Sequence, residues 1–363
     1  MITIPKRTKR VTSEWLNDVL HNSGYLKDTN INTISIEPCG AGKGFLSDLA
    51  RFRITYDNES PLLPETMIVK MPIAFRAIVN SPNNFYEREI RFYNEIAPLS
   101  PVRVPDVIYS DYDLETNRYI LILEDCSQYR VVHQLEGLNQ EQTKQIITSI
   151  ADFHARWWDA HDLFSFDWIP KPKSEYLMSF VDIFRITWDF STKSDEFLAF
   201  LPEDSRKIGD KLYEQMPWLI NSDPDQNLTI THYDLRSENI FFDYNNRENP
   251  IIILDWGTAI ISVGILDLAY LLAGSIKIDL RRKIEKDMIK FYLKRLEKKG
   301  INGLEFEFFW NFYLKSLLRY SYLVPLSFTQ LQRDSEVHEL GTTMMKRIFT
   351  AIIDNDAISI CPI

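Results

Sequence analysis

The feature that most constrains this chain is a pair of short apolar runs, each followed at once by polar residues. The first run, residues 228–231, leads through His232 to Asp234, and Asn239 follows five positions after that aspartate. The second run, residues 251–254, leads directly into Asp255. Short apolar runs bounded by polar residues predict buried strands. We therefore expect two strand ends to bring two carboxylates and an amide to one edge of the fold.

Two carboxylates and an amide at these offsets suit phosphoryl transfer, in which a protein mainly positions groups and stabilises charge. We expect Asp234 to orient or deprotonate an acceptor hydroxyl, and Arg236 to place a cation beside the transferred phosphate. Asn239 and Asp255 offer the hard oxygen ligands that Mg²⁺ prefers. His232 is expected to be a structural hydrogen-bonding residue. A polar hairpin beside a core strand is the alternative interpretation of the motif.

A single acidic residue, Asp267, stands in the almost wholly apolar segment 265–272, which predicts a buried helix. Because burying an unpaired carboxylate is costly, Asp267 is expected to accept hydrogen bonds from backbone N–H groups of the loop that carries Asp234. Direct contact with a substrate is the alternative. Only 12 positions separate Asp255 from Asp267, and the closing Ala-Pro-Glu of protein kinases is absent. This spacing favours a small-molecule hydroxyl over a peptide as the acceptor.

A glycine-rich turn lies between two predicted strands, residues 31–39 and 51–56. Glycines let backbone N–H groups approach a phosphate closely. The turn is not a Walker A loop, since Gly44 stands where that loop has Ser or Thr, and a strand follows where a Rossmann fingerprint has a helix. Strand–turn–strand is typical of a kinase nucleotide lid. We expect Gly42, Gly44 and Ser47 to contact the nucleotide, with an ordinary hairpin turn as the alternative.

Lys70 ends the third predicted strand, and Glu89 lies on the helix predicted for residues 85–96. A lysine and a glutamate from these elements would pair and hold the α- and β-phosphates of a nucleotide. Glu87 and Glu95 are rival partners for the lysine. The alternatives are a lysine at a sheet edge and glutamates on a solvated helix face.

The apolar strand predicted for residues 119–123 leads into Glu124, Asp125 and Cys126. We expect the backbone C=O of Glu124 and the backbone N–H of Cys126 to bind an adenine edge, and the thiol to be a small apolar filler. Residues 1–123 are predicted to form a nucleotide-binding lobe on an antiparallel sheet. Residues 124–363 are predicted to form a larger, mainly helical lobe for catalysis and substrate binding. The fold class is therefore α+β, in the bilobal arrangement of protein kinases.

Composition limits the partners and the compartment. The formal net charge is −10, which argues against nucleic acid as a partner. The three cysteines are far apart and odd in number, which indicates a reducing compartment. No run of about 18 apolar residues occurs, so we expect no membrane partner and a cytoplasmic location. Basic residues crowd the segment 281–299, but acidic residues intersperse with them, so a solvated helix face is expected, with a partner surface as the alternative.

These motifs resemble the aminoglycoside phosphotransferase and choline kinase-like superfamily over about residues 30–350. The pattern His-x-Asp-Leu-x-x-x-Asn is matched by residues 232–239, an apolar strand before Asp-Trp by 253–256, and Gly-x-x-Asp-Leu-Ala by 264–269. Residues 89–93, 123–125 and 153–158, the last reading Phe-His-Ala-Arg-Trp-Trp, are similar to the ecdysteroid-kinase-like branch. The resemblance implies a bilobal kinase-like fold, ATP and Mg²⁺ as cofactors, and phosphorylation of a small-molecule hydroxyl.

Two residues depart from that pattern. Tyr233 stands where the superfamily usually has glycine, which would crowd or reshape the acceptor site beside Asp234. Gly257 is similar to the last residue of the Asp-Phe-Gly of protein kinases, where Gln is often found in this superfamily. The sequence therefore predicts an ATP- and Mg²⁺-dependent phosphotransferase acting on a hydroxyl of a small molecule. A nucleotide-binding regulator with a kinase fold (a pseudokinase) and a protein kinase are the alternatives, and the oligomeric state is not predicted.

Overall fold

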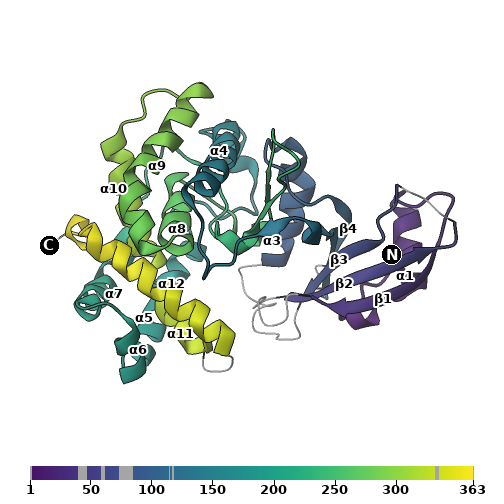
Figure 1. Ribbon diagram of the computed structural model, residues 1–363, viewed down its shortest axis with the longest axis horizontal. Helices are drawn as coiled ribbons and strands as arrows, with labels where there is room; N and C mark the ends of the chain where they lie inside the picture. The colour runs from purple at the N-terminus through teal and green to yellow at the C-terminus, as the bar shows by residue number, and fades with distance from the viewer. Residues whose placement is uncertain are drawn as a thin grey trace. The chain divides into compact units, whose positions relative to one another are not determined.

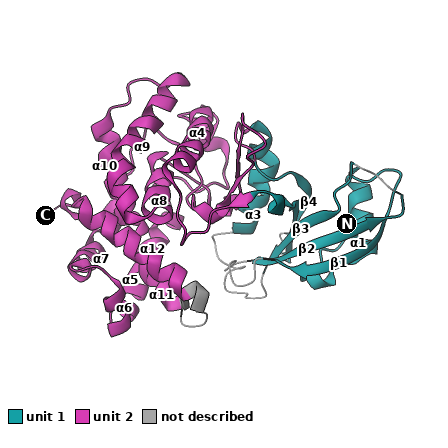
Figure 2. Ribbon diagram, in the orientation of Figure 1, with its two compact units in different colours: residues 1–99, 104–129 teal, residues 100–103, 130–363 magenta. Residues whose placement is uncertain are grey.

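The computed structural model describes residues 2–39, 47–58, 62–72, 85–113, 115–116, 118–331 and 335–362 (Figure 1). The chain divides into two compact units (Figure 2). Unit 1 comprises residues 1–99 and 104–129, and unit 2 comprises residues 100–103 and 130–363. The boundary expected after residue 123 falls inside unit 1, close to the end of its last strand.

Unit 1 is built on a five-stranded antiparallel sheet with the strand order β1-β2-β3-β5-β4. The strands are β1 (Ile31–Pro38), β2 (Ser47–Tyr56), β3 (Thr66–Pro72), β4 (Val107–Asp113) and β5 (Arg118–Glu124). In β2 the buried residues Ala50, Phe52 and Ile54 alternate with more exposed ones, because successive side chains of a strand point to opposite faces. The predicted sheet is therefore confirmed.

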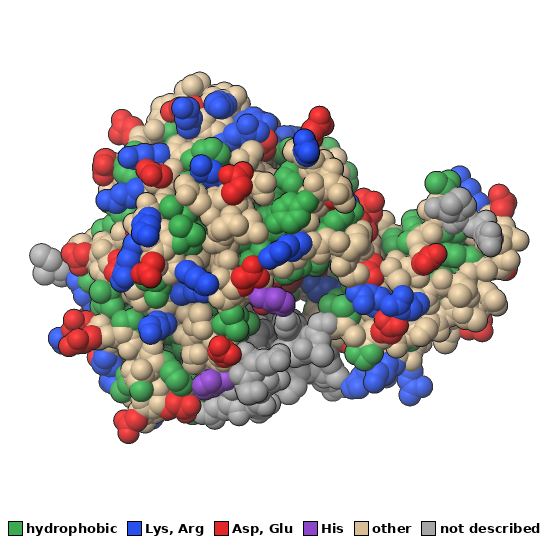
Figure 3. Space-filling view, viewed as in Figure 1, with side chains coloured by type: hydrophobic (Ala, Val, Ile, Leu, Met, Phe, Trp, Pro, Cys, Tyr) green, Lys and Arg blue, Asp and Glu red, His purple; other side chains and the backbone are tan. Residues whose placement is uncertain are grey.

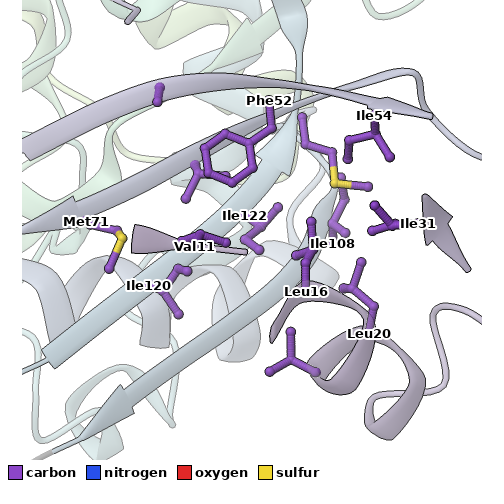
Figure 4. Close-up of a cluster of buried hydrophobic side chains, with 14 of the residues drawn as sticks. Val11, Leu16, Leu20, Ile31, Phe52, Ile54, Met71, Ile108, Ile120 and Ile122 are labelled. Atoms are coloured by element: carbon purple, nitrogen blue, oxygen red, sulfur yellow. The ribbon is translucent and has the colours of Figure 1, made fainter. Parts of the chain in front are cut away.

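One face of this sheet is covered by helix α1 (Ser13–Asn22). The Thr12 hydroxyl caps the helix by accepting a hydrogen bond from the Trp15 N–H at 3.2 Å. Leu16 and Leu20 then pack in one buried cluster with Phe52 and other apolar side chains of the strands (Figure 4). Each such side chain contributes about 1.5–3 kcal/mol when fully removed from water. This cluster holds β3, and with it Lys70, in place.

The helix predicted for residues 85–96 changes its winding part-way along. It consists of α3 (Phe85–Arg91), a π-helical turn η2 (Phe92–Ile96) and a 3-10 turn η3 (Ala97–Leu99). Pro98 has no N–H to continue an α-helix, and its ring clashes with the carbonyl four residues earlier. Pro98, in η3, therefore keeps the chain from resuming an α-helix after the π-helical turn.

Unit 2 is mainly helical. Its α-helices within the described residues are α4 (Gln140–Trp157), α5 (Glu175–Ser191), α6 (Asp195–Phe200), α7 (Ser205–Asn221), α8 (Ile265–Ser275), α9 (Ile278–Lys298), α10 (Phe306–Tyr320), α11 (Leu323–Leu331) and α12 (Ser335–Asp354). Residues 188–217, which the sequence predicts to be helical without clear boundaries, span the end of α5, all of α6 and most of α7. Two local signals cause the breaks. Ser194 caps α6 through its side chain, and Pro202 disfavours helical geometry in the residue before it.

The basic segment forms the surface of α9. Ile284, Met288, Tyr292 and Leu296 are buried, as their helical spacing predicts. Charged side chains of both signs are interspersed over the molecular surface in Figure 3, and several basic residues of α9 form ion pairs, such as Arg295 with Asp152 at 2.6 Å. The interpretation as a solvated helix face agrees with this pattern.

Two small sheets in unit 2 complete the fold. Strands β6 (Arg130–Val131), β8 (Ile240–Phe242) and β9 (Ile251–Ile253) form one, and β7 (Thr229–Thr231) with β10 (Ile260–Ser262) forms the other. β6 and β10 were not predicted, because each is short and neither is followed by the polar motif that marks β7 and β9. Arg103 forms a parallel bridge with Ile252 and an ion pair with Asp243 at 2.8 Å, which ties residues 100–103 to unit 2.

Within the described part of the chain, none of the helices combines the length and the apolar character that spanning a bilayer requires.

Candidate functional site

The loop between β7 and β8, residues 232–239, carries Asp234 and is anchored by Asp267 of α8. The Asp267 carboxylate accepts hydrogen bonds from the backbone N–H of His232 at 2.7 Å and from that of Tyr233 at 2.8 Å. Asp267 is fully buried. Hydrogen bonds to a charged group offset the cost of removing that group from water. The structure thus brings Asp267 to the backbone of the loop, which is where the sequence predicted it.

His232 links this loop to the end of β9. Its Nε2 lies 2.7 Å from the carbonyl oxygen of Leu254, and its Nδ1 lies 3.2 Å from the backbone N–H of Asp234. A carbonyl only accepts and a backbone N–H only donates, so the proton is on Nε2 and Nδ1 is an acceptor. Trp256 packs against the ring with the ring centroids 4.6 Å apart. His232 therefore holds together the two segments that carry Asp234 and Asp255.

Asn239 fixes the side chain of Asp234. Its Nδ2 donates hydrogen bonds to the backbone oxygen of Asp234 at 2.9 Å and to Oδ2 of the same residue at 3.0 Å. Both amide hydrogens are thus directed to Asp234, and the amide oxygen Oδ1 remains as a possible ligand atom. Burial, together with the negative charge of the nearby Asp255, raises the pKa of Asp234. The structure therefore brings these three predicted residues together.

Arg236 lies beside Asp234, and its guanidinium is oriented by a residue that sequence reasoning missed. The Nη1 group donates a hydrogen bond to Glu238 at 2.5 Å, and Nε lies 3.6 Å from Oδ1 of Asp234. Burial opposes the charge, but the two carboxylates outweigh it and raise the pKa of Arg236. Arg236 is therefore a fixed cation next to Asp234. The sequence feature that could have indicated Glu238 as a partner of Arg236 was its position two residues after that arginine.

Two residues of the site have left-handed backbone conformations, Tyr233 with φ 67° and Asp255 with φ 64°. This region costs a residue with a Cβ atom about 1–2 kcal/mol and therefore favours glycine. The Tyr233 ring is buried and packs against Phe180 of α5 and Tyr320 of α10, with ring centroids 5.9 and 5.6 Å away. The tyrosine thus adopts a conformation that favours glycine, and the packing of its ring offsets the backbone strain.

Tyr270 is a second residue that sequence reasoning missed. Burial and the neighbouring Asp234 carboxylate raise the pKa of Tyr270. Its ring stacks on Tyr320 with the centroids 4.6 Å apart. Tyr270 lies three residues after Asp267 on α8, a spacing that places both side chains on one face of the helix. That spacing was the available signal.

In unit 1, Lys70 and Glu89 form an ion pair. Lys70 Nζ donates to Glu89 Oε1 at 2.7 Å, and the hydroxyl of Tyr119 donates to Glu89 Oε2 at 3.0 Å. Lys70 is on β3, with β2 on one side and β5 on the other, so the interpretation as an edge lysine is wrong. The rival residues Glu87 and Glu95 form ion pairs with Arg91 instead. Tyr119, which orients Glu89, was not predicted.

The remaining predicted nucleotide contacts also belong to unit 1. Gly42 and Gly44 lie outside the described residues, and Ser47 begins β2 opposite Pro72 of β3. Glu124 ends β5, and its backbone N–H donates to Asp106 O at 2.9 Å. Cys126 begins the 3-10 turn η4 (Cys126–Gln128), and its side chain is buried.

The residues predicted to hold a metal ion are an asparagine and an aspartate. Among the described residues, no three His, Cys, Asp or Glu side chains are grouped closely enough to hold a metal ion. Asn239 and Asp255 together offer an amide oxygen and a carboxylate. Mg²⁺ prefers such oxygen ligands, and it usually takes one or two from a protein and completes its shell with waters and substrate phosphates.

The sequence matches the model of the family described as ecdysteroid kinase-like over residues 41–157 and 164–302. The chain belongs to the ecdysteroid kinase-like family. The matched segments include Lys70, Glu89 and the whole of residues 232–267. Among curated proteins, no match to this chain was found.

Solved structures of small-molecule kinases are similar to this fold. A Ralstonia eutropha protein with the provisional name aminoglycoside phosphotransferase has a TM-score of 0.55 and 17% identity, covering 91% of this chain and 94% of its own. Plasmodium vivax ethanolamine kinase has a TM-score of 0.55 and 14% identity, covering 90% and 85%. The ternary complex of APH(2″)-IIa with streptomycin and ATP has a TM-score of 0.52 and 14% identity, covering 93% and 96%. At these identities the likeness establishes the fold, which is the predicted bilobal, kinase-like α+β fold.

Proposed function

We propose that this protein is an ATP- and Mg²⁺-dependent phosphotransferase that phosphorylates a hydroxyl group of a small molecule. The observation that carries the proposal is the arrangement of Asp234. Its carboxylate is fixed by Asn239 and flanked by the cation of Arg236. A carboxylate and a cation held side by side are the groups that a phosphoryl acceptor and the transferred phosphate require.

Asp234 would act on the acceptor. Its carboxylate would accept the proton of the acceptor hydroxyl as the oxygen–phosphorus bond forms, or orient that hydroxyl for attack. The burial and the nearby charge that raise its pKa also make it a better proton acceptor. Arg236, whose charge is secured by two carboxylates, would stabilise negative charge on the phosphate oxygens.

Asn239 and Asp255 would hold Mg²⁺. The amide hydrogens of Asn239 are directed to Asp234, which leaves Oδ1 for a cation, and Asp255 brings its carboxylate close to the same aspartate. When bound, Mg²⁺ would neutralise charge on the nucleotide phosphates. The protein's own contribution would be to hold Asn239 and Asp255 near Asp234.

Lys70 and Glu89 would bind the nucleotide. The proposal assigns the α- and β-phosphates to Lys70, which Glu89 orients through their 2.7 Å ion pair. Further phosphate contacts are proposed for Gly42, Gly44 and Ser47. The adenine edge is assigned to backbone groups of Glu124 and Cys126.

The segment between Asp255 and Asp267 supports a small acceptor. It consists of the turn η7 (Trp256–Thr258) and the strand β10, and it enters α8 directly. All residues of this segment belong to these elements or to their short connections, so the segment itself contains no additional loop that could bind a peptide. The names of the similar structures, which include ethanolamine kinase and a streptomycin complex, agree with a small substrate. A cytoplasmic protein that acts without a nucleic-acid or membrane partner remains the prediction from the sequence.

The test is transfer of the γ-phosphate of ATP to a panel of hydroxylated small molecules in the presence of Mg²⁺. The Asp234→Ala variant is expected to lose about 10²–10⁴-fold in rate. Asp287→Ala, which removes an exposed carboxylate from α9, serves as the control and should keep the wild-type rate. Unchanged transfer by Asp234→Ala would overturn the mechanism. ATP binding without transfer to any hydroxyl would favour a nucleotide-binding regulator.

A further inference from the structure

His154 is a fully buried, hydrogen-bonded residue that the proposed reaction does not use. It lies on α4, within the segment Phe-His-Ala-Arg-Trp-Trp at residues 153–158. Its Nε2 is 3.2 Å from Oδ2 of Asp267, and its Nδ1 is 2.9 Å from the hydroxyl of Tyr292 on α9. An ionised carboxylate only accepts hydrogen bonds, so Nε2 donates to Asp267. In the neutral ring Nδ1 then accepts from Tyr292.

The His154–Tyr292 hydrogen bond is closely packed against the start of α8. Helices α4, α8 and α9 lie near one another in unit 2 (Figure 1). Gly264, which immediately precedes α8, lies beside this hydrogen bond. A Cβ atom at this position would lie 2.2 Å from the Tyr292 hydroxyl and 2.5 Å from His154 Nδ1. The glycine therefore lets the start of α8 approach the His154–Tyr292 hydrogen bond.

Asp267 connects this buried cluster to the catalytic loop. Its Oδ2 receives both the His154 ring N–H and the backbone N–H of His232, and its Oδ1 receives the backbone N–H of Tyr233. Tyr233, one of the two site residues with a left-handed backbone, immediately precedes Asp234. Strained conformations persist only where the surrounding contacts over-determine them. The hydrogen bond from the Tyr233 N–H to Asp267, together with the packing of the Tyr233 ring, therefore helps to hold that conformation.

We propose that His154 is a positioning residue for the phosphotransfer reaction. By donating to Asp267 it fixes the carboxylate that holds the amides of His232 and Tyr233, and it thereby orients Asp234. This role rests on the proposed function, since orientation of Asp234 matters to the rate only if Asp234 acts on the acceptor. Hydrogen bonding that merely satisfies a buried histidine would leave the catalytic loop unaffected by changes at His154.

Three substitutions separate these roles. His154→Gln keeps an N–H donor near the position of Nε2 and loses the acceptor for Tyr292, whereas His154→Leu removes both. Tyr292→Phe removes only the hydroxyl that donates to Nδ1. Ile150→Ala is the matched control for stability, because Ile150 is fully buried on α4 one turn before His154 and has an apolar side chain.

In steady-state assays of phosphotransfer, His154→Leu is expected to lower kcat about 10–100-fold, the range seen for residues that orient a catalytic group. The KM for ATP should change less than about twofold, because His154 acts on the acceptor side. His154→Gln should recover most of the kcat that His154→Leu loses. Tyr292→Phe should have a kcat similar to that of His154→Gln. The positioning role of His154 would be overturned if His154→Leu and Ile150→Ala had equal kcat per folded molecule. It would also be overturned if His154→Gln recovered none of the lost kcat.

Amide hydrogen exchange provides a readout that does not depend on catalysis. In His154→Leu the backbone amides of His232 and Tyr233 should exchange faster than in the wild type, while Ile150→Ala should leave their protection unchanged relative to that of β7. Should His154→Leu fail to fold, His154→Asn carries the same comparison, because its shorter amide does not reach the position of Nε2 that donates to Asp267. Faster exchange without any phosphotransfer in the wild type would reject the proposed function alone. Unchanged exchange with active wild-type enzyme would reject the positioning role alone.

Discussion

Asn239 directs its side-chain amide to Asp234 twice, at 2.9 Å to the backbone oxygen and at 3.0 Å to Oδ2. The residue proposed as a metal ligand is thus also the residue that orients the proposed acceptor base. One side chain therefore links the position of the cation to the position of the acceptor, and loss of that side chain should affect both.

Asn239→Ala is expected to lower kcat by about 10–100-fold, because the carboxylate of Asp234 loses its donor. The Mg²⁺ concentration for half-maximal rate should rise as well, since an oxygen ligand is lost. Titration of the rate with Mg²⁺ measures both effects. Asn245→Ala, at an exposed loop position in the same unit, is the control. A lower kcat with an unchanged Mg²⁺ requirement would contradict the metal role of Asn239.

Asp234→Asn should abolish phosphotransfer and raise the thermal stability of the protein at pH 7. Burial and the charge of Asp255 raise the pKa of Asp234, which means that its ionised form destabilises the folded state. The destabilisation is present above the folded-state pKa and disappears as the pH falls below the unfolded value. Asparagine is neutral and retains an oxygen that can accept from Asn239.

The measurement for Asp234→Asn is the unfolding midpoint of both proteins from pH 7 down to about pH 4. The advantage of the variant should shrink as the pH falls, because the wild-type carboxyl becomes protonated in the folded state first. A variant that is less stable than the wild type at pH 7 would show that the ionised carboxylate stabilises the fold.

Tyr233→Gly is expected to be more stable than Tyr233→Ala by about 1 kcal/mol, although both should be less stable than the wild type. Both variants lose a buried aromatic ring, a change that costs about 3–5 kcal/mol, but only glycine also removes the strain of the left-handed backbone. Chemical denaturation of the three proteins measures the order. Equal stability of the two variants would indicate that the backbone at Tyr233 is unstrained.

The sequence predicted those parts of the fold whose signals are local. Alternation in β2 and helical spacing in α9 each specify a buried face, and both faces are buried in the structure. Glu238 and Tyr270 were missed because their positions, two residues after Arg236 and three residues after Asp267, do not distinguish a site residue from a solvated or core residue. Their contacts within the site arise only when the loop that contains η6 (Ser237–Asn239) packs against α8.

The breaks between α5, α6 and α7 were missed for a different reason. Residues 188–217 are rich in helix-forming side chains, and the signals that interrupt them are single residues, Ser194 and Pro202. Glu89 was the predicted partner of Lys70, with Glu87 and Glu95 as rivals. Helical spacing does not decide which glutamate faces the sheet, and in the structure the Tyr119 hydroxyl of β5 contacts Glu89.

That buried ion pair gives the last prediction. Lys70 and Glu89 have 14% and 3% of their side-chain surface exposed, so Lys70→Met should destabilise the protein by about 3–5 kcal/mol by leaving a carboxylate buried. The double variant Lys70→Met/Glu89→Gln should recover most of this stability, because neither position then carries a charge. Denaturant unfolding of both single variants and the double variant measures the coupling between the two positions.

The exposed pair of Arg53 and Glu37 in the same sheet is the matched control for this double-variant experiment. Its side chains are 58% and 42% exposed, so Arg53→Met should change stability by no more than about 1 kcal/mol.

The double variant Lys70→Met/Glu89→Gln also separates folding from function. It should fold nearly as well as the wild type but show no thermal stabilisation by ATP with Mg²⁺, since the cation assigned to the phosphates is gone. Full stabilisation by ATP in the double variant would remove Lys70 from the proposed nucleotide site.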